Sequence, residues 1–272
     1  MEYFNPQAGI RPAVLATDLD GTFIPLAGSL QNREDLRQLA GHFESPEISL
    51  IFATGRHYES VLEVMGEIPL PEPDWLICDV GSRILHHTEG SWQELAIYTE
   101  HLQALTGGLA RCQVEAVLEG VEGLKLQVPE HQTELKISYQ CASARLEGLL
   151  TEVGQRLGDM PYTHMGSVDP FLDCGLIDVM PAGVSKAYAL LWLATHADFR
   201  PDEMIYAGDS GNDLAALAGG FRGIVVANAS KGLSDKVAAL QKERGIPDDH
   251  LYQAQGTATS GVLEGCRHYG LL

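Results

Sequence analysis

The sequence predicts an α/β protein built on a Rossmann-like parallel sheet, with an α+β segment inserted into this core. Two observations carry the prediction. Short apolar runs alternate with helical stretches near both ends of the chain, as in a parallel sheet with right-handed crossovers. Two of these runs also end in carboxylates and glycine, which is typical of buried strands that open into loops at their carboxyl ends.

The core elements are expected in a regular order. Strands are predicted at 13–17, 48–53 and 75–79, with helices between them at 32–43 and 58–66. The pattern resumes with strands at 204–207, 223–227 and near 251–252, followed by a last helix at 260–269. A chain of 272 residues with 45% hydrophobic content is long enough for one large domain or two smaller ones.

The middle of the chain does not continue the regular alternation of strands and helices. Helices are expected at 94–106 and 144–157, and short strands at 135–139, 171–172 and 176–179. We therefore divide the chain into a core of residues 1–83 and 179–272 and an inserted α+β domain of residues 84–178. The natural hinges are Gly81-Ser82 and Pro181-Ala182-Gly183.

Two acidic clusters lie at the ends of predicted strands. Asp18-Leu19-Asp20-Gly21-Thr22 follows the first strand, and Gly208-Asp209-Ser210-Gly211-Asn212-Asp213 follows the strand at 204–207. If the two strands are neighbours, four carboxylates share the crevice where open α/β sheets bind ligands. Such a concentration of negative charge requires a cation, and hard oxygen ligands suit Mg²⁺.

Two further fragments lie between the clusters. The run Ile51-Phe52-Ala53 leads into Thr54-Gly55-Arg56, and Pro181 to Ser185 leads into Lys186 at the start of a helical stretch. The four fragments, in this order, resemble the four signature motifs of the haloacid dehalogenase superfamily. The resemblance spans nearly the whole chain. It implies a phosphatase or phosphotransferase core with an inserted cap domain, which would close over the substrate and select the leaving group.

The resemblance implies a role for each motif residue. Asp18 is the nucleophile that forms an aspartyl phosphate, and Asp20 is the general acid and base. Thr54 and Gly55 bind a phosphate oxygen, and Lys186 neutralises charge on Asp18 and the phosphoryl group. The small Gly21 allows the backbone to approach the phosphate.

The same resemblance assigns the metal ligands. Asp209 and a carboxylate oxygen of Asp18 bind Mg²⁺ directly, together with the backbone carbonyl of Asp20. Asp213 is expected to hold the metal's waters, and Asn212 either orients the loop or touches phosphate. Taken singly, each fragment also fits a plain strand-to-loop turn, a solvated lysine or a helix cap, and only their joint order favours catalysis.

Composition limits the partners. A net charge of −19 disfavours nucleic acid and anionic membranes. It also repels a phosphorylated substrate at long range, so attraction must come locally from metal, Lys186 and Arg56. The five scattered cysteines favour reduced thiols, and the first residues lack a signal peptide, so we expect a cytoplasmic protein. The sequence does not predict the oligomeric state.

The substrate is expected to be a phosphorylated sugar. The Gly-Asp-Ser-Gly-Asn-Asp motif, Leu176 to Pro181 and the ending Thr259 to Tyr269 resemble the sucrose-phosphate phosphatase and mannosylfructose-phosphate phosphatase group. Hexose-phosphate, mannosylglycerate-type or broad-specificity phosphatases, a phosphomutase and a non-catalytic sugar-phosphate sensor remain alternatives. Candidate sugar contacts in the insertion are Lys136, Ser138 and Tyr139 on one strand, and Asp178. Alternation places Lys136 and Ser138 on one face and Tyr139 on the other. The alternative for Lys136 is a solvated lysine.

Overall fold

An eight-stranded sheet organises the larger part of the molecule, in the order β12-β11-β10-β1-β2-β3-β4-β5. The computed structural model describes residues 3–7, 9–45, 47–168 and 173–272. The pairs from β12 to β3 are all parallel, and β4 and β5 continue the sheet as an antiparallel hairpin. The strands are β1 (Val14–Thr17), β2 (Ser49–Ala53), β3 (Trp75–Cys78), β4 (Arg83–Thr88), β5 (Ser91–Glu94), β10 (Met204–Gly208), β11 (Arg222–Val225) and β12 (Leu251–Gln253).

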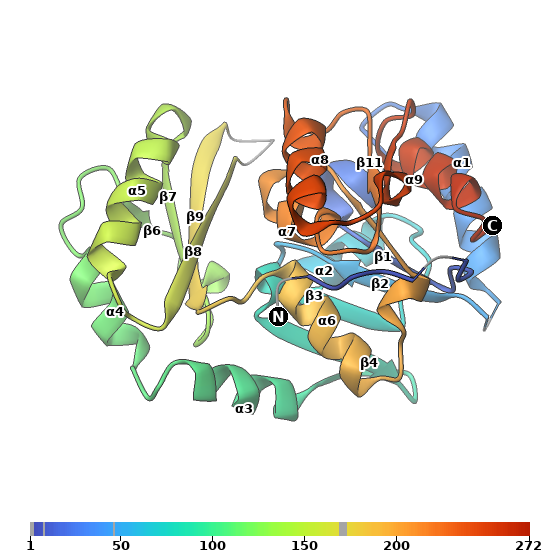
Figure 1. Ribbon diagram of the computed structural model, residues 1–272. Helices are drawn as coiled ribbons and strands as arrows, with labels where there is room; N and C mark the ends of the chain where they lie inside the picture. The colour runs from blue at the N-terminus through green and yellow to red at the C-terminus, as the bar shows by residue number, and fades with distance from the viewer. Residues whose placement is uncertain (1–2, 8, 46, 169–172) are drawn as a thin grey trace. The chain divides into compact units, whose positions relative to one another are not determined.

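Helices connect these strands as the alternating sequence pattern predicts (Figure 1). They are α1 (Leu30–Phe43), α2 (Tyr58–Glu67), α6 (Lys186–His196), α7 (Leu214–Leu217), α8 (Leu233–Arg244) and α9 (Ala258–His268). In the part of the chain that the structure describes, none of the helices combines the length and apolarity needed to span a bilayer.

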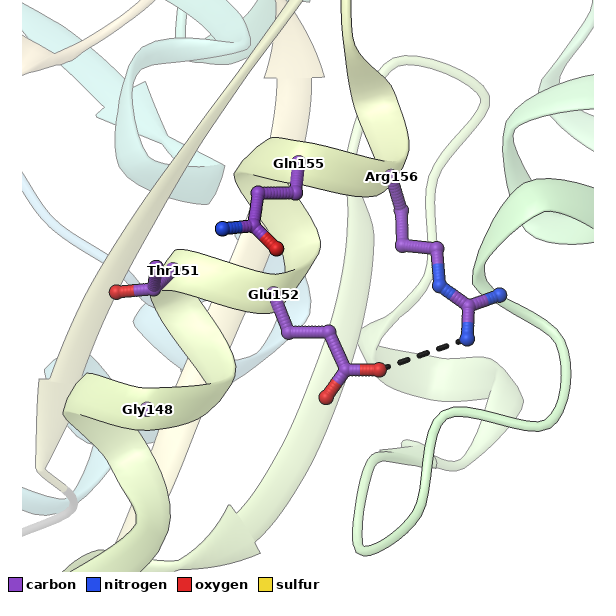
Figure 2. Close-up of a pocket in the computed structure, with 5 residues that line it drawn as sticks. All are labelled: Gly148, Thr151, Glu152, Gln155 and Arg156. Atoms are coloured by element: carbon purple, nitrogen blue, oxygen red, sulfur yellow. Dashed lines mark hydrogen bonds and ion pairs between the residues drawn. The ribbon is translucent and has the colours of Figure 1, made fainter.

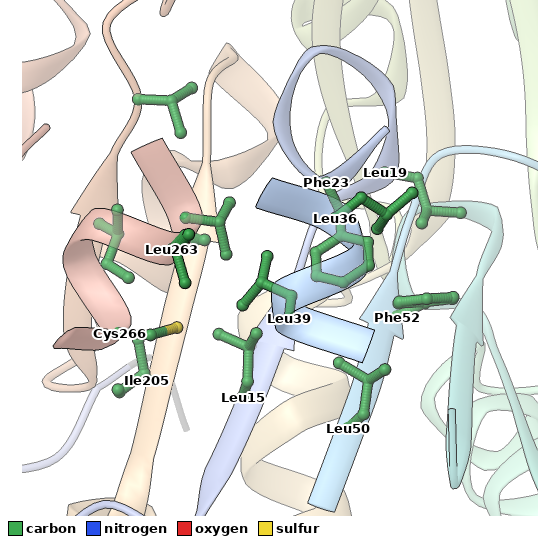
Figure 3. Close-up of a cluster of buried hydrophobic side chains, with 14 of the residues drawn as sticks. Leu15, Leu19, Phe23, Leu36, Leu39, Leu50, Phe52, Ile205, Leu263 and Cys266 are labelled. Carbon is green, nitrogen blue, oxygen red and sulfur yellow. The ribbon is translucent and has the colours of Figure 1, made fainter. Parts of the chain in front are cut away.

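One apolar layer lies between the sheet and the pair α1 and α9 (Figure 3). Leu15 and Leu50 project from the strands toward Leu39 of α1 and Leu263 of α9, and all four are buried. Burying a leucine side chain stabilises the fold by about 1.5–3 kcal/mol. This packing fixes the directions of β1 and β2, and with them the positions of the residues at their carboxyl ends.

The chain divides into two units. The core unit comprises the residues up to Glu94 together with Ser185–Leu272, and the cap unit is Leu95–Val184. The crossings thus lie later in the chain than the boundaries at 84 and 179 expected from the sequence. The first is later because the hairpin β4–β5 pairs with β3 in the core sheet, and the second because Pro181 still pairs with Tyr162 in the sheet of the cap unit. Gly81 accordingly lies inside the core unit and not at a crossing.

The cap unit is a four-stranded antiparallel sheet with helices on one face. Its sheet has the order β6-β7-β9-β8, and α4 and α5 lie against it (Figure 1). The elements are α3 (Ala96–Leu105), α4 (Arg111–Leu118), β6 (Lys125–Leu126), β7 (Ile137–Ala142), α5 (Leu146–Leu157), β8 (Tyr162–Val168) and β9 (Cys174–Pro181). The strand expected at Phe171-Leu172 lies outside the described residues.

The apolar core of the cap unit lies between α4, α5 and the sheet. Val114 and Val153 of the helices pack with Ile137, Tyr139 and Ile177 of the strands. Because side chains alternate along a strand, the intervening residues of β7 and β9 face away from these helices. The cap sheet therefore has one apolar face and one face that carries polar side chains.

Candidate active site

The two acidic clusters meet at one edge of the core sheet. Strands β1 and β10 are parallel neighbours with Thr17 opposite Ala207, and the Asp18 amide donates to the Ala207 carbonyl at 2.9 Å. Their carboxyl ends therefore lie side by side, as the sequence predicts. Among the described residues, carboxylate oxygens of Asp18, Asp209 and Asp213 all lie within 4.8 Å of one another.

Lys186 neutralises part of this charge. Its Nζ donates to Asp18 Oδ1 and to Asp213 Oδ1, at 2.7 Å in both cases, and its side chain is fully buried. Burial alone would lower the pKa of Lys186, but the two carboxylates outweigh burial and raise it. The ammonium group is thus a permanent positive charge between the two aspartates.

The start of α6 places Lys186. Ser185 caps the helix by accepting from the Tyr188 amide at 3.1 Å. The turn that follows β3 packs against this point: Gly81 has φ +102°, and a Cβ there would collide with the Ser185 carbonyl. Only glycine fits at this position, so the helix start is held by a backbone contact inside the core unit.

The remaining negative charge favours a cation. Burial raises the pKa of Asp18 despite the opposing effect of Lys186, and Asp213 and Asp209 raise it further. Burial and Asp213 also raise the pKa of Asp209 to about 7. Three carboxylates against one lysine leave an excess of oxygen donors and negative charge, which fits a hard divalent ion such as Mg²⁺. Asp18 and Asp209 are the carboxylates with the chemistry to hold it.

Asp213 is saturated with hydrogen bonds from the protein. Its Oδ1 accepts from Lys186 Nζ at 2.7 Å and from the Tyr206 hydroxyl at 2.6 Å. Its Oδ2 accepts from the amides of Asp209 and Ser210, both at 3.0 Å, and from Ser210 Oγ at 3.3 Å. Asp213 therefore organises the loop and the lysine. Tyr206 was not anticipated from the sequence, because an aromatic residue in a buried strand resembles any other core residue.

Asp20 has a different partner. Arg56 forms a bidentate ion pair with its carboxylate, in which Nε donates to Oδ2 at 2.6 Å and Nη2 donates to Oδ1 at 2.7 Å. Both side chains are about a quarter exposed. The remaining Arg56 nitrogen, Nη1, donates to Ser60 Oγ at 2.7 Å. The hydrogen bond to Asp20 raises the pKa of Arg56. The structure thus pairs Arg56, a candidate substrate contact in the sequence, with the expected acid and base.

The second motif lies on the neighbouring strand. Thr54 is buried at the end of β2, its amide donates to the Ile77 carbonyl at 2.8 Å, and its Oγ1 accepts from the Arg56 amide at 3.1 Å. A Cβ at Gly55 would lie 3.7 Å from Asn212 Nδ2. This brings the second motif beside the loop of the fourth motif, at the same edge as Asp18.

Gly21 lies against the acidic cluster. It has φ +73°, and a Cβ there would overlap the Asp209 carboxylate, so the loop needs glycine for both conformation and space. The Gly21 carbonyl accepts from Asn228 Nδ2 at 2.7 Å, and Asn228 Oδ1 accepts from the Ala258 amide at 2.7 Å. Asn228 is a second residue that sequence reasoning missed, since an asparagine after a strand usually marks only a turn.

A separate polar cluster lies in the cap unit. Ser138 and Asp178 are cross-strand neighbours, with Ser138 Oγ donating to Asp178 Oδ1 at 2.6 Å. Lys136, just before β7, is 4% exposed, which contradicts its alternative reading as a solvated lysine. Tyr139 packs in the apolar core instead, so the predicted alternation of faces is confirmed.

A hollow of about 380 Å³ on the surface of α5 has none of this chemistry (Figure 2). Its lining side chains include the ion pair of Glu152 and Arg156, 3.5 Å apart. Gly148, Thr151 and Gln155 complete the lining. Nothing in this set matches the buried carboxylates and lysine of the core unit, so we place the candidate active site at the acidic cluster.

Comparison with known proteins identifies the family. Residues 11–270 match the family model of sucrose-6F-phosphate phosphohydrolase. The chain belongs to this family. As a member of the sucrose-6F-phosphate phosphohydrolase family, it is a phosphatase of the haloacid dehalogenase superfamily, which confirms the resemblance, the fold class and the enzyme class expected from the sequence.

Individual relatives agree with the family. A HAD-like hydrolase of Nitrosococcus oceani is 32% identical over 94% of this chain and 71% of its own length. The mannosylfructose-phosphate phosphatase of Agrobacterium fabrum is 29% identical over 95% of this chain and 97% of its own. The crystal structure of the sucrose-phosphatase of Synechocystis, in complex with sucrose and phosphate, has a TM-score of 0.76 and 28% identity. That match covers 96% of this chain and 99% of the other.

Proposed function

We propose that the protein is a Mg²⁺-dependent phosphatase that hydrolyses a sugar phosphate monoester, a disaccharide phosphate such as sucrose 6-phosphate or mannosylfructose phosphate. The observation that carries the proposal is the buried Lys186 shared by Asp18 and Asp213, beside Asp209. The similarity to a mannosylfructose-phosphate phosphatase and to a sucrose-phosphatase supports the choice of sugar.

Asp18 is the proposed nucleophile. A carboxylate oxygen attacks phosphorus, the bond to the sugar oxygen breaks, and an aspartyl phosphate forms. The contact of 2.7 Å from Lys186 holds the carboxylate in one orientation and offsets its repulsion of the phosphate dianion. Thr54 and Gly55, at the same edge, supply donors to a phosphate oxygen.

Asp20 is the proposed acid and base. It gives a proton to the leaving sugar oxygen in the first step, and takes one from the water that attacks the aspartyl phosphate in the second. Its exposed fraction of about a quarter suits a group that exchanges protons with substrate and water. Arg56 holds its carboxylate in place for both steps.

Asp18 and Asp209, with the backbone carbonyl of Asp20, are the proposed Mg²⁺ ligands. When bound, the ion supplies positive charge that offsets repulsion between the nucleophile and the phosphate. We expect EDTA to suppress activity and Mg²⁺ to restore it. We expect Ca²⁺ to compete without supporting turnover, because it takes more ligands at longer distances.

The cap unit is the proposed selector of the leaving group. Its polar sheet face carries a serine, an acid and a lysine, which together offer hydrogen bonds of both kinds to sugar hydroxyls. The phosphate-site residues of the core unit would then treat all monoesters alike, and the cap would discriminate between sugars.

A substrate panel tests the function. Release of inorganic phosphate from phosphorylated mono- and disaccharides is measured with Mg²⁺, with Asp18→Asn as the inactive control. We expect the highest kcat/KM for a disaccharide phosphate. If the enzyme prefers hexose or mannosylglycerate phosphates, or no single sugar, the proposed disaccharide substrate is wrong and that preference takes its place. Phosphate moving within one sugar without release would indicate a mutase, and binding without turnover would indicate a sensor.

Lys136→Ala tests the role of the cap. We expect kcat/KM for a disaccharide phosphate to fall roughly tenfold or more, as for one charged hydrogen bond, with p-nitrophenyl phosphate hydrolysis nearly unchanged. Lys125→Ala is the matched control, because Lys125 is an exposed lysine on the same cap sheet. An equal loss on both substrates would assign Lys136 to folding instead.

A further inference from the structure

A buried tyrosine lies behind the acidic cluster. Tyr206, in β10, is completely buried, and its hydroxyl donates to Asp213 Oδ1 at 2.6 Å. The same oxygen accepts from Lys186 Nζ at 2.7 Å, and that ammonium group also donates to Asp18 Oδ1 at 2.7 Å. A continuous line of hydrogen bonds therefore runs from the tyrosine to the proposed nucleophile.

We propose that Tyr206 is a positioning residue for the reaction, because its hydroxyl fixes Asp213 Oδ1 and through it the Lys186 ammonium group beside Asp18. The inference rests on the proposed phosphatase function. It adds a residue that touches neither the phosphate nor the metal and acts only through its neighbours.

The two oxygens of Asp213 have separate tasks. Oδ2 accepts from two loop amides, of Asp209 and Ser210, which anchors the carboxylate to the loop. Among the described residues, the hydrogen bonds to Oδ1 come from Tyr206 and Lys186. Without the Tyr206 hydroxyl, the only remaining donor to Oδ1 would be Lys186, which also donates to Asp18. The carboxylate would then be free to turn about its anchored oxygen, and the ammonium group would move with it.

The hydroxyl remains a donor at every working pH. Burial raises the pKa of Tyr206 well above its usual range, and the charges of Asp213 and Asp18 raise it further. Its role is thus geometric. Because Tyr206 is fully buried, a phenylalanine variant leaves Asp213 Oδ1 without this hydrogen bond.

The chain contains a matched hydrogen bond remote from the reaction. The Tyr252 hydroxyl donates to Glu264 Oε1, also at 2.6 Å, and Glu264 likewise accepts from two backbone amides, those of Gln255 and Gly256. The two arrangements share a tyrosine, a carboxylate and a pair of amides. They differ in burial, because Tyr252 is only partly buried, and in the lysine: in the described part of the chain Lys186 donates to Asp213, and no lysine donates to Glu264.

The test compares Tyr206→Phe with Tyr252→Phe in the full-length protein at saturating Mg²⁺. We expect Tyr206→Phe to lower kcat roughly tenfold, the effect of losing one hydrogen bond to a charged group, with KM changed less than about twofold. The loss should be equal for p-nitrophenyl phosphate and for a sugar phosphate, because Lys186 serves the phosphoryl group common to both. Tyr252→Phe should keep kcat within about twofold, with a smaller loss of Tm because Tyr252 is only partly buried.

A second variant separates positioning from folding. Tyr206→4-aminophenylalanine keeps a donor of the same shape and should recover part of the lost kcat. The proposal is overturned if Tyr206→Phe keeps its kcat within about twofold, or if 4-aminophenylalanine gives no recovery over phenylalanine in samples of equal folded fraction. If the wild-type protein hydrolyses no phosphate ester at all, the proposed function fails instead, which is a distinct result.

Discussion

Asp18 and Asp20 are separated by one residue, yet they lie in very different surroundings. Asp18 is 5% exposed and held by the fully buried Lys186, whereas Asp20 is about a quarter exposed and held by the fork of Arg56. A buried ion pair has few alternative geometries, because breaking it leaves an uncompensated charge. A pair at the surface rearranges easily. The contrast matches a nucleophile that needs a fixed line of attack and an acid that must exchange protons.

The largest effect is expected at the buried carboxylate. Asp18→Asn should abolish turnover, by roughly 7 kcal/mol or more in activation free energy if covalent catalysis is removed entirely. An amide is a poor nucleophile and a poor Mg²⁺ ligand. Phosphate release is measured on samples whose fold is verified by circular dichroism. Hydrolysis at the wild-type rate would contradict the mechanism.

Asp20→Asn should cost less, and its cost should depend on the leaving group. We expect a loss of about 10²–10⁴-fold for a sugar phosphate, the usual range for general acid–base catalysis. The loss should be much smaller for p-nitrophenyl phosphate, whose leaving group barely needs a proton. Rates are compared on both esters. Equal losses would remove Asp20 from the acid role and erase the contrast with Asp18.

The metal requirement distinguishes the two aspartates of the fourth motif. Asp209→Ala should raise the half-saturating Mg²⁺ concentration far more than Asp213→Ala, because the Asp213 oxygens already accept hydrogen bonds from the protein. Asp213→Ala should instead lower kcat, since it frees Lys186. Mg²⁺ titrations of activity measure both values. If Asp213→Ala is the more sensitive to Mg²⁺, the assignment of metal ligands is reversed.

Metal binding should weaken as the pH falls through 7. Burial and Asp213 raise the pKa of Asp209 to about 7, and a metal ligand must be deprotonated. Below pH 7 protons compete with Mg²⁺, so its half-saturating concentration should be roughly tenfold higher at pH 6 than at pH 8. Activity is titrated with Mg²⁺ at each pH. Asp209→Asn serves as a control that should weaken the dependence and leave only the part due to Asp18, whose pKa is also raised. A flat response in the wild-type protein would be evidence against Asp209 as a ligand.

The smallest effect is expected at the surface pair. Arg56→Lys keeps the charge but loses the fork, and kcat for a sugar phosphate should fall by about three- to tenfold. Arg83→Lys, in the comparable ion pair with Glu94 at 2.7 Å, is the matched control and should leave kcat unchanged. A loss above a hundredfold for Arg56→Lys would show that the surface pair is as constrained as the buried one.

Much of the site could be predicted from the sequence, because the ends of buried strands can be recognised there. A run such as Ala13-Val14-Leu15-Ala16 before Asp18, and Met204 to Ala207 before Asp209, places both carboxylates at one sheet edge once the strands are parallel. The strands β1, β2, β3 and β10 lie within a residue or two of their predicted bounds for the same reason.

The hydrogen-bond and ion-pair partners of these site residues could not be predicted from the sequence. The pairing of Asp20 with Arg56 depends on side-chain directions that no spacing reveals. Tyr206 has the apolar pattern of its strand and shows its role only through the position of its hydroxyl. The hairpin β4–β5 was placed in the insertion because a short antiparallel extension of a parallel sheet has no signal of its own beside an α+β segment.

The contact of Gly81 with Ser185 also bears on how the sequence of the inserted segment can vary. Lys186 is placed by a backbone contact within the core unit, immediately after the chain returns from the cap unit. The residues that place the start of this helix therefore belong to the core unit itself. If the cap unit selects the sugar, as we propose, one core can be combined with different insertions, and selectivity can diverge through residues 95–184 while the chemistry proposed for the core is retained.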